Sequence, residues 1–410
     1  MVLERAWPRA KAMDPGTWRR HTVDLISLLR QRLPTAEIAA IAVDGTSGTT
    51  FLCDELSGQP LTPVLAYNDG RAAAEAQALA AHGLNLGAAA GPYGGPAKCL
   101  WLAKTSRRGT RARITTQGAW LTGVLLGRFD RMDEHNALKL GYDGAWHEAI
   151  SLLPAHLDVP HIVSAGAPLG PLARPLARRL GLRQRPLVVA GTTDSTAAYL
   201  ALGRLPPGTG VTSLGSTLVC KIESPQRVCV PEYGIYSHRL GTHWLVGGAS
   251  NSGGAVLAHY FDRDTLRRLS AALPMAQSTG LDYYPLVTPG ERFPINDPQL
   301  PPRLSPRPAD DRLFLQGLLE GLAAIEARGY ALLASHGAPV ARRVLSTGGG
   351  SANAAWQAIR AQALEIPVMR AGHRPAAIGA ARLARAGHAR TGRGEASALH
   401  LTLDMGLRMH

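Results

Sequence analysis

Several short segments of the sequence place reactive polar residues in a turn directly after an apolar run. The clearest is AGTTDSTAAYLALG, in which Asp194 follows the apolar run PLVVA at residues 186–190. A carboxylate at this point can accept the proton of a substrate hydroxyl while that hydroxyl attacks the γ-phosphate of a nucleotide. Asp194 can also be the N-cap of the helix that follows, and the two roles are compatible.

Two further turns carry groups that can hydrogen-bond a sugar. Asp44 and Ser47 lie in the turn DGTSG, which follows the apolar run IAAIAV at residues 38–43. Their side chains can bind sugar hydroxyls, although Asp-Gly is also a common signal for a plain turn. The segment Tyr67–Asp69 is similar, and there the alternative is an N-cap for the next helix.

Glycine-rich turns suggest a nucleotide site. Gly215 and Ser216 form a tight turn within residues 209–222, and a triple glycine at residues 348–350 lies between a predicted strand and a helix. Glycine allows a ligand to approach the backbone closely, and exposed N–H groups can hold phosphate oxygens. Trp356, about one helical turn after Asn353, can stack on a base or belong to the core. A P-loop and a GxGxxG dinucleotide motif are both absent from the sequence.

The elements that must position these turns alternate between strands and helices, which is typical of an α/β protein. We expect an amphipathic helix opened by Asp14 and Pro15, a strand at residues 38–43, and a helix directly after Asp194. A length of 410 residues favours two domains. The segment Pro206–Gly208 suggests a hinge between them.

Composition narrows the class of protein but not the reaction. The chain is 45% hydrophobic and 18% charged, as expected for a globular protein, and it contains no run long enough to span a membrane. Its four cysteines form no C-x-x-C pair, so we expect reduced thiols in the cytoplasm and no zinc site, and we assign no residue to a metal. The net charge of +14 comes from scattered arginines that do not alternate with aromatic residues, which favours a solvated surface over nucleic-acid binding.

Taken in order, these segments resemble the FGGY family of carbohydrate kinases, in the actin/hexokinase/chaperone ATPase superfamily. The similarity runs from about residue 6 to about residue 385 and is strongest to the D-ribulose kinase and xylulokinase-like subgroup. It is carried by VDGTSGT, HNALKLGY, AGTTDSTAAYLA, TSLGST, YSHRLG, GGASNSGG, LDYYPL, GERFPI and STGGGSANAAWQ.

The resemblance implies two actin-like (ribonuclease H-like) domains on either side of a cleft. It gives a sugar-binding domain at residues 1–203 plus 375–410 and a nucleotide-binding domain at residues 204–374. It implies that Asp194 is the general base, that Asp44 and Ser47 bind the sugar, and that ATP with Mg²⁺ donates the phosphoryl group to a terminal hydroxyl of D-ribulose or D-xylulose. The residues that it assigns to the nucleotide are Gly215, Ser216, Gly349, Gly350, Asn353 and Trp356.

One departure from the family pattern leaves an alternative open. The family begins with a β-hairpin that carries an Asp-x-Gly-Thr motif and contacts the ATP phosphates, whereas this sequence starts in what resembles the next strand and helix. We expect a start site placed too late, or else a relative that binds sugar or nucleotide without catalysis. The segment after residue 385 resembles nothing in the family. No membrane or nucleic-acid partner is expected, and the oligomeric state and the identity of the ketose stay open.

Overall fold

The computed structural model describes residues 3–6, 8–33, 38–84, 86–106, 111–273, 277–372 and 374–392. The chain divides into two compact units: unit 1 comprises Met1–Arg204 and Arg374–His410, and unit 2 comprises Leu205–His373. Residues 393–410, most of the segment that resembles nothing in the family, lie outside the described residues. No helix among the described residues is both long and apolar enough to cross a membrane.

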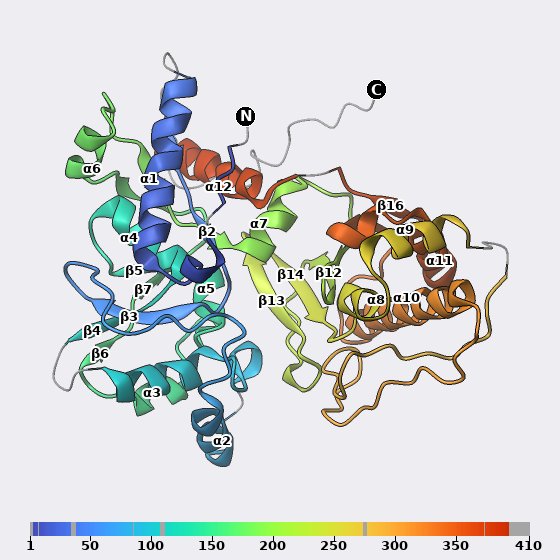
Figure 1. Cartoon of the computed structure of the whole chain (residues 1–410). Helices are drawn as coiled ribbons and strands as arrows, with labels where there is room; N and C mark the ends of the chain where they lie inside the picture. Colours follow the sequence, from blue (N-terminus) through green and yellow to red (C-terminus); the bar gives the residue numbers. More distant parts are fainter. Residues whose placement is uncertain are drawn as a thin grey trace. The chain divides into compact units, whose positions relative to one another are not determined.

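Unit 1 contains short strands and helices (Figure 1). Its helices are α1 (Pro15–Arg32), α2 (Ala73–Ala81), α3 (Gly95–Thr105), α4 (Gln117–Leu126), α5 (Glu134–Leu138), α6 (Arg174–Arg179), α7 (Asp194–Ala201) and α12 (Ala376–Thr391). Its strands are β1 (Ala40–Ile41), β2 (Asp44–Gly45), β3 (Thr50–Asp54), β4 (Ala112–Thr116), β5 (Arg131–Asp133), β6 (Leu157–Asp158), β7 (His161–Val163), β8 (Pro168–Pro171), β9 (Leu187–Val189) and β10 (Thr192–Thr193).

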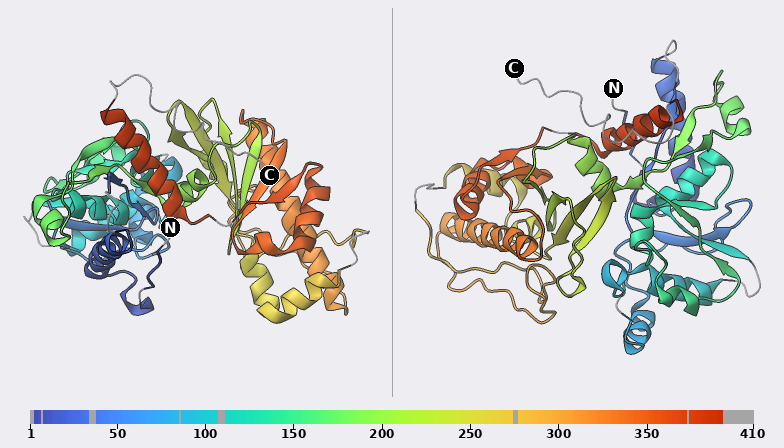
Figure 2. Two further views of the ribbon diagram at one scale, coloured as in Figure 1. Left: turned by 90° about the horizontal axis from the view of Figure 1, so that it is seen from above. Right: turned by 180° about the vertical axis from the view of Figure 1, so that it is seen from behind.

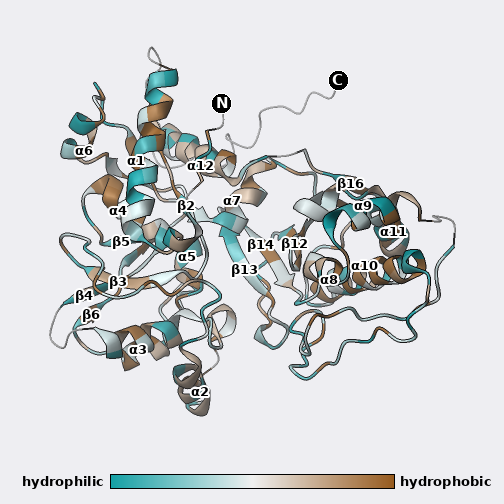
Figure 3. Ribbon diagram, viewed as in Figure 1, coloured by the Kyte–Doolittle hydropathy of each residue, from teal (hydrophilic) through white to brown (hydrophobic). Residues whose placement is uncertain are grey.

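Helix α1 begins where the sequence predicts. The Asp14 side chain accepts hydrogen bonds from the backbone N–H groups of Gly16 and Thr17, and Pro15 occupies the first helical position. In Figure 3, α1 alternates between hydrophobic and hydrophilic residues along its length, as a helix with one buried face must. The residues on that face include Trp18, Val23 and Ile26.

The expected strand at residues 38–43 is only Ala40–Ile41 in the structure, and the expected turn begins with a second short strand, Asp44–Gly45, so this prediction was wrong in detail. Strand β1 pairs in parallel with β9, whereas β2 pairs in parallel with β10 in a second, two-stranded sheet. Between the two pairings, the backbones at Val43 and Gly191 come very close. A Cβ atom on Gly191 would lie only 1.7 Å from the carbonyl oxygen of Val43. The break therefore follows from a close approach that only glycine permits.

Helix α12 brings the end of the described chain back to unit 1. Figure 2 shows this red helix among blue and green elements that come from much earlier in the sequence. It packs against α7 so closely that a Cβ atom on Gly379 would lie 1.9 Å from the carbonyl oxygen of Ala197. Helix α7, which begins with Asp194, is thus held by a segment nearly 200 positions away in the sequence.

Unit 2 is built around one six-stranded mixed sheet with the strand order β13-β14-β12-β11-β15-β16. Its strands are β11 (Thr209–Leu214), β12 (Leu218–Ser224), β13 (Tyr236–Leu240), β14 (His243–Ala249), β15 (Arg343–Thr347) and β16 (Val368–Arg370). Its helices are α8 (Gly254–Tyr260), α9 (Arg263–Ala271), α10 (Asp311–Ser335) and α11 (Ala354–Leu364). Strands β11 and β12 form the expected antiparallel pair around the Gly215–Ser216 turn, and a large apolar core joins the sheet to α10 and α11.

Candidate active site

The pairing of β2 with β10 brings two candidate carboxylates of unit 1 together. Thr192 lies opposite Asp44 and Thr193 opposite Gly45, so the next residue of the second strand, Asp194, leaves the sheet beside Asp44. Both strands run in the same direction, which places their carboxyl ends at one edge of the sheet. The Asp44 and Asp194 carboxylates are close enough to repel each other.

The environment of Asp44 changes its acidity. Partial burial raises the pKa of the Asp44 carboxyl above its usual value, and the negative charge of Asp194 raises this pKa further. The Asp194 side chain itself is exposed. The two neighbouring carboxyl groups therefore have different environments, an arrangement that separates the roles of two acids in many active sites.

Asp194 is the first residue of α7, and the N-cap position is occupied by Thr193. Its carboxylate accepts a hydrogen bond from the backbone N–H of Ser195 at 2.6 Å. Asp194 is therefore not the N-cap residue itself but the residue after it. Its carboxylate nevertheless binds a backbone N–H at the start of the helix. A negative charge there is favoured by the helix dipole.

The turn after Asp44 is held from outside by α4. The side-chain oxygen Oε1 of Gln117 accepts hydrogen bonds from the backbone N–H of Thr46 at 3.0 Å and from its hydroxyl at 2.9 Å. Ser47 follows, half-buried, and its hydroxyl has no hydrogen-bond partner in the part of the chain that the structure describes. A hydroxyl on a fixed turn near the two carboxylates is suited to bind a polar ligand.

Sequence reasoning missed the two side chains that fix this turn. Gln117 begins a nearly wholly buried helix, and Lys98 lies in α3 and reaches the carbonyl oxygen of Gly48. Both positions look like ordinary helix polar residues in the sequence. Only the folded contacts, across 50 and 71 positions of chain, reveal their function as supports.

In unit 2 the two glycine turns meet at the end of β11. A Cβ atom on Gly348, which has a φ of +80°, would lie 2.7 Å from the carbonyl oxygen of Leu214, so the triple-glycine loop lies against the residue that precedes Gly215. Gly349 borders open space, because a Cβ atom on it would meet nothing within 4 Å apart from its chain neighbours. Two backbone loops with exposed glycines side by side can bind the phosphates and flat base of a nucleotide.

A third glycine turn supports the first. The carbonyl oxygens of Gly215 and Ser216 accept hydrogen bonds from the backbone N–H groups of Gly254 and Ala255, at 2.9 and 3.0 Å. Glu291, almost fully buried, accepts hydrogen bonds from the Ser250 hydroxyl and from the backbone N–H of Asn251. The segment GGASNSGG therefore holds the Gly215–Ser216 turn in place.

The structure favours the core interpretation of Trp356. Its side chain is 1% exposed, and its ring lies behind Gly350, where a Cβ atom would come within 2.5 Å of it. Asn353 caps α11, accepting a hydrogen bond from the backbone N–H of Trp356, and its amide donates to the Ser270 hydroxyl. Both residues therefore shape the glycine loop from behind.

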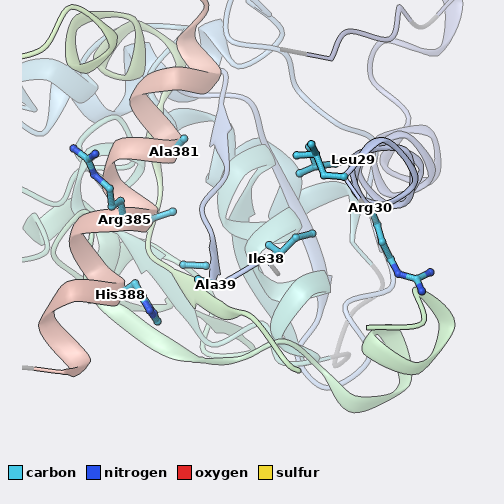
Figure 4. Close-up of a pocket in the computed structure, with 10 residues that line it drawn as sticks. Leu29, Arg30, Ile38, Ala39, Ala381, Arg385 and His388 are labelled. Carbon is cyan, nitrogen blue, oxygen red and sulfur yellow. The ribbon is translucent and has the colours of Figure 1, made fainter. Parts of the chain in front are cut away.

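A cavity of about 310 Å³ lies elsewhere in unit 1, between α1 and α12 along the outer edge of β1. It is lined mainly by leucine, isoleucine and alanine, and Figure 4 shows the side chains of Arg30 and Arg385 pointing away from Ala39. None of the candidate site residues lines it. The polar residues that line this groove are Arg30, Arg385 and His388, so the groove is separate from the carboxylates Asp44 and Asp194.

Comparison with solved structures identifies the fold. A xyloylose kinase from Brucella ovis superposes with a TM-score of 0.82 over 95% of this chain and 83% of that chain, at 24% identity. A xylulose kinase from Rhodospirillum rubrum gives 0.77 over 95% and 83%, at 22% identity. Plasmodium falciparum glycerol kinase with ADP gives 0.79 over 96% and 84%, at 15% identity. The fold is therefore the two-domain α/β fold of these kinases.

A sequence comparison identifies a domain within the chain. Residues 210–387 match the C-terminal domain of the FGGY family of carbohydrate kinases, and this range contains both glycine turns. By sequence, this part of the chain is similar to the C-terminal domain of FGGY carbohydrate kinases, and by structure the chain has the fold of solved sugar kinases.

Proposed function

We propose that this protein transfers the γ-phosphoryl group of ATP to the terminal hydroxyl of a ketopentose, D-ribulose or D-xylulose. The observation that carries the proposal is the parallel pairing of β2 and β10, which brings Asp44 and Asp194 together at one edge of unit 1. The xylulose kinases among the similar structures support a five-carbon ketose as the acceptor.

Asp194 acts as the general base. Its carboxylate is exposed at the start of α7 and so can reach a substrate hydroxyl, whose proton it removes as the oxygen attacks phosphorus. Asp44, half-buried and less acidic than usual, together with the Ser47 hydroxyl, binds other hydroxyl groups of the sugar. Fixed hydrogen-bonding groups of this kind hold the attacking oxygen in place, which contributes much of the rate of phosphoryl transfer.

The nucleotide binds to unit 2 at the Gly215–Ser216 turn and the glycine loop around Gly349 and Gly350. Backbone N–H groups and the Ser216 hydroxyl hold phosphate oxygens, while the open space at Gly349 accommodates the base. Mg²⁺ bound with ATP neutralises phosphate charge, and it is commonly held by one or two carboxylates plus phosphate oxygens. The neighbouring carboxylates Asp44 and Asp194 would offer oxygen ligands to this ion in unit 1.

A steady-state assay with D-ribulose and D-xylulose tests the proposal. We expect Asp194→Ala to lower kcat/KM for the ketose by about 10²- to 10⁴-fold, the usual contribution of a general base. The matched control is Asp264→Ala, because Asp264 is also an acidic residue in the first turn of a helix and lies in α9, outside the candidate site. Equal activity of the Asp194→Ala variant and the wild-type protein would contradict the assignment of the base.

A further inference from the structure

One buried side chain joins the two segments of unit 1 that carry polar residues for the acceptor. Lys98, in α3, is 0% exposed. Its Nζ donates hydrogen bonds to the carbonyl oxygens of Gly48 at 2.9 Å, Ala66 at 2.7 Å and Tyr67 at 3.3 Å. An ammonium group has three hydrogens and no acceptor, so these three carbonyl groups satisfy it completely.

This arrangement opposes the usual preference of lysine for water. The three direct partners are neutral carbonyl groups, and burial lowers the pKa of Lys98 to about 8, against the opposing effect of the Asp69 carboxylate. An apolar side chain would fill this space without the desolvation penalty of a buried ammonium. Packing alone therefore does not account for a lysine at this position.

The held carbonyl groups belong to chain segments with exposed functional groups. Gly48 directly follows Ser47, whose hydroxyl we place in the sugar site. Tyr67 is 57% exposed and directly precedes Asn68 and Asp69. Backbone pairing between Thr50 and Leu65 already brings the two segments side by side, and Lys98 binds them together where that pairing ends.

Helix α3 is a rigid base for this contact. A Cβ atom on Gly95 would lie 2.5 Å from both the Leu140 Cα and the Lys139 carbonyl oxygen, so the start of α3 lies directly against that backbone. Farther along the helix, the ring of Trp101 lies under the Arg71 guanidinium at 5.0 Å. Arg71 in turn forms a two-pronged hydrogen-bonded pair with Asp69.

We infer that Lys98 is a positioning residue for the acceptor sugar. By holding the two backbone segments, Lys98 fixes the Ser47 hydroxyl and the Tyr67 ring as one preformed wall of the sugar site. This inference rests on the proposed function. A wall that is already ordered needs no further ordering when a polyhydroxylated ligand binds, so affinity is gained without a new contact. Loss of Lys98 therefore weakens binding of the sugar and leaves the nucleotide loops of unit 2 unchanged.

Calorimetric titration of D-xylulose and D-ribulose into the 410-residue protein without ATP tests the inference apart from catalysis. We expect Lys98→Met to raise the Kd of the sugar at least about tenfold, which corresponds to about 1.4 kcal/mol, and to leave the Kd of ATP within about twofold. Lys104→Met is the control, because it removes the ion pair of Lys104 with the buried Glu75 from the same helix without touching either segment. Equal sugar affinity in Lys98→Met and wild type would overturn the inference. A wild-type protein that binds no ketose would overturn the proposed function and the inference with it.

The pH dependence of sugar binding by the wild-type protein gives a second test that does not depend on a variant folding. The charged or titratable groups near Lys98 are Asp69, Lys139 and the Cys99 thiol. The pKa of Asp69 is lowered by its bond to Arg71, and the pKa of Cys99 is raised to about 12 by burial, so neither group titrates between pH 7 and 9.5. We expect the Kd of the sugar to rise several-fold across this range as Lys98 loses the proton that bonds one carbonyl. A constant Kd would contradict the inference.

Discussion

The two carboxylates of unit 1 illustrate how neighbouring residues of one type acquire different properties. Asp44 is half-buried and its pKa is raised, first by burial and then by Asp194, which stands exposed at the start of α7. Keeping an ionised Asp44 in this position opposes folding, because its charged form is less stable here than in the unfolded chain. Functional sites often hold such strain.

Replacing Asp44 should therefore separate stability from activity. We expect Asp44→Asn to raise the free energy of unfolding at pH 7, because it removes the penalty of an ionised and partly buried carboxylate, while the KM for the sugar increases. A carboxyl group with a raised folded pKa binds its proton more tightly when folded, so the wild-type protein regains stability as the pH falls through that pKa. The difference in the free energy of unfolding between the wild-type protein and Asp44→Asn, measured from urea-unfolding curves, should thus become smaller toward pH 4.

Asp264→Asn serves as the comparison for that experiment, because Asp264 is highly exposed in α9. Its free energy of unfolding should differ little from that of the wild-type protein at any pH. A variant Asp44→Asn that is less stable than wild type at neutral pH would show that Asp44 is a structural residue.

At the scale of elements, the glycine loop of unit 2 is held by a buried charge network. Arg360 of α11 donates to both oxygens of Glu326 in α10, at 2.5 and 2.7 Å, and both side chains are almost fully buried. Arg360 also donates to the Ser346 hydroxyl of β15, and Glu326 accepts from the Thr212 hydroxyl of β11. The network therefore ties both helices to the two strands whose ends carry the glycine turns.

Breaking one side of this network should weaken the unit and its ligand site together. We expect Glu326→Gln to lower the free energy of unfolding by about 3–5 kcal/mol, because it leaves the buried Arg360 guanidinium without its counter-charge. Binding of ATP should weaken as α11 and the glycine loop lose their support. Thermal unfolding and ATP titration measure the two effects.

The control for Glu326→Gln is Arg267→Gln, which removes one partner of the exposed pair formed with Asp264. Arg267→Gln should change the free energy of unfolding by less than about 1 kcal/mol. Similar stabilities of the two variants would contradict the role of the buried network.

The sequence predicted elements better than it predicted contacts. The α1 start at Asp14 and Pro15, the β11–β12 hairpin and the helix after Asp194 are confirmed, because capping residues, turn glycines and apolar periodicity act locally. The pairing of Ala40–Ile41 and of Asp44–Gly45 in separate sheets depends on Gly191, far along the chain, and so was not predictable. Lys98 and Gln117 were missed for the same reason, and burial of Trp356 depends on packing across the whole of unit 2.

At the scale of the whole molecule, the chain carries a strong positive charge, and the phosphoryl donor that we propose, ATP, is an anion. Its net charge is +14 at pH 7. A positive field accelerates the approach of an anion such as ATP, and added salt screens this attraction. An uncharged ketose should not respond to the field.

Ionic strength therefore offers a test within one enzyme. We expect kcat/KM for ATP to fall several-fold between about 20 and 300 mM NaCl as the Debye length shortens, whereas the KM for the ketose should stay nearly constant. Steady-state kinetics with each substrate varied in turn measures both, and the sugar serves as the internal control. An equal response of the two substrates would mean that salt acts on the fold or on catalysis and not on ATP attraction.

The most direct test of the central claim is to follow the phosphoryl group itself. ³¹P NMR of the protein with Mg²⁺-ATP and either D-xylulose or D-ribulose shows whether phosphate moves from ATP to the terminal hydroxyl of the sugar. The account predicts a new phosphomonoester signal together with ADP in the wild-type protein, and at most trace product with Asp194→Ala. Absence of any sugar phosphate with the wild-type protein, or equal product with the variant, would contradict it.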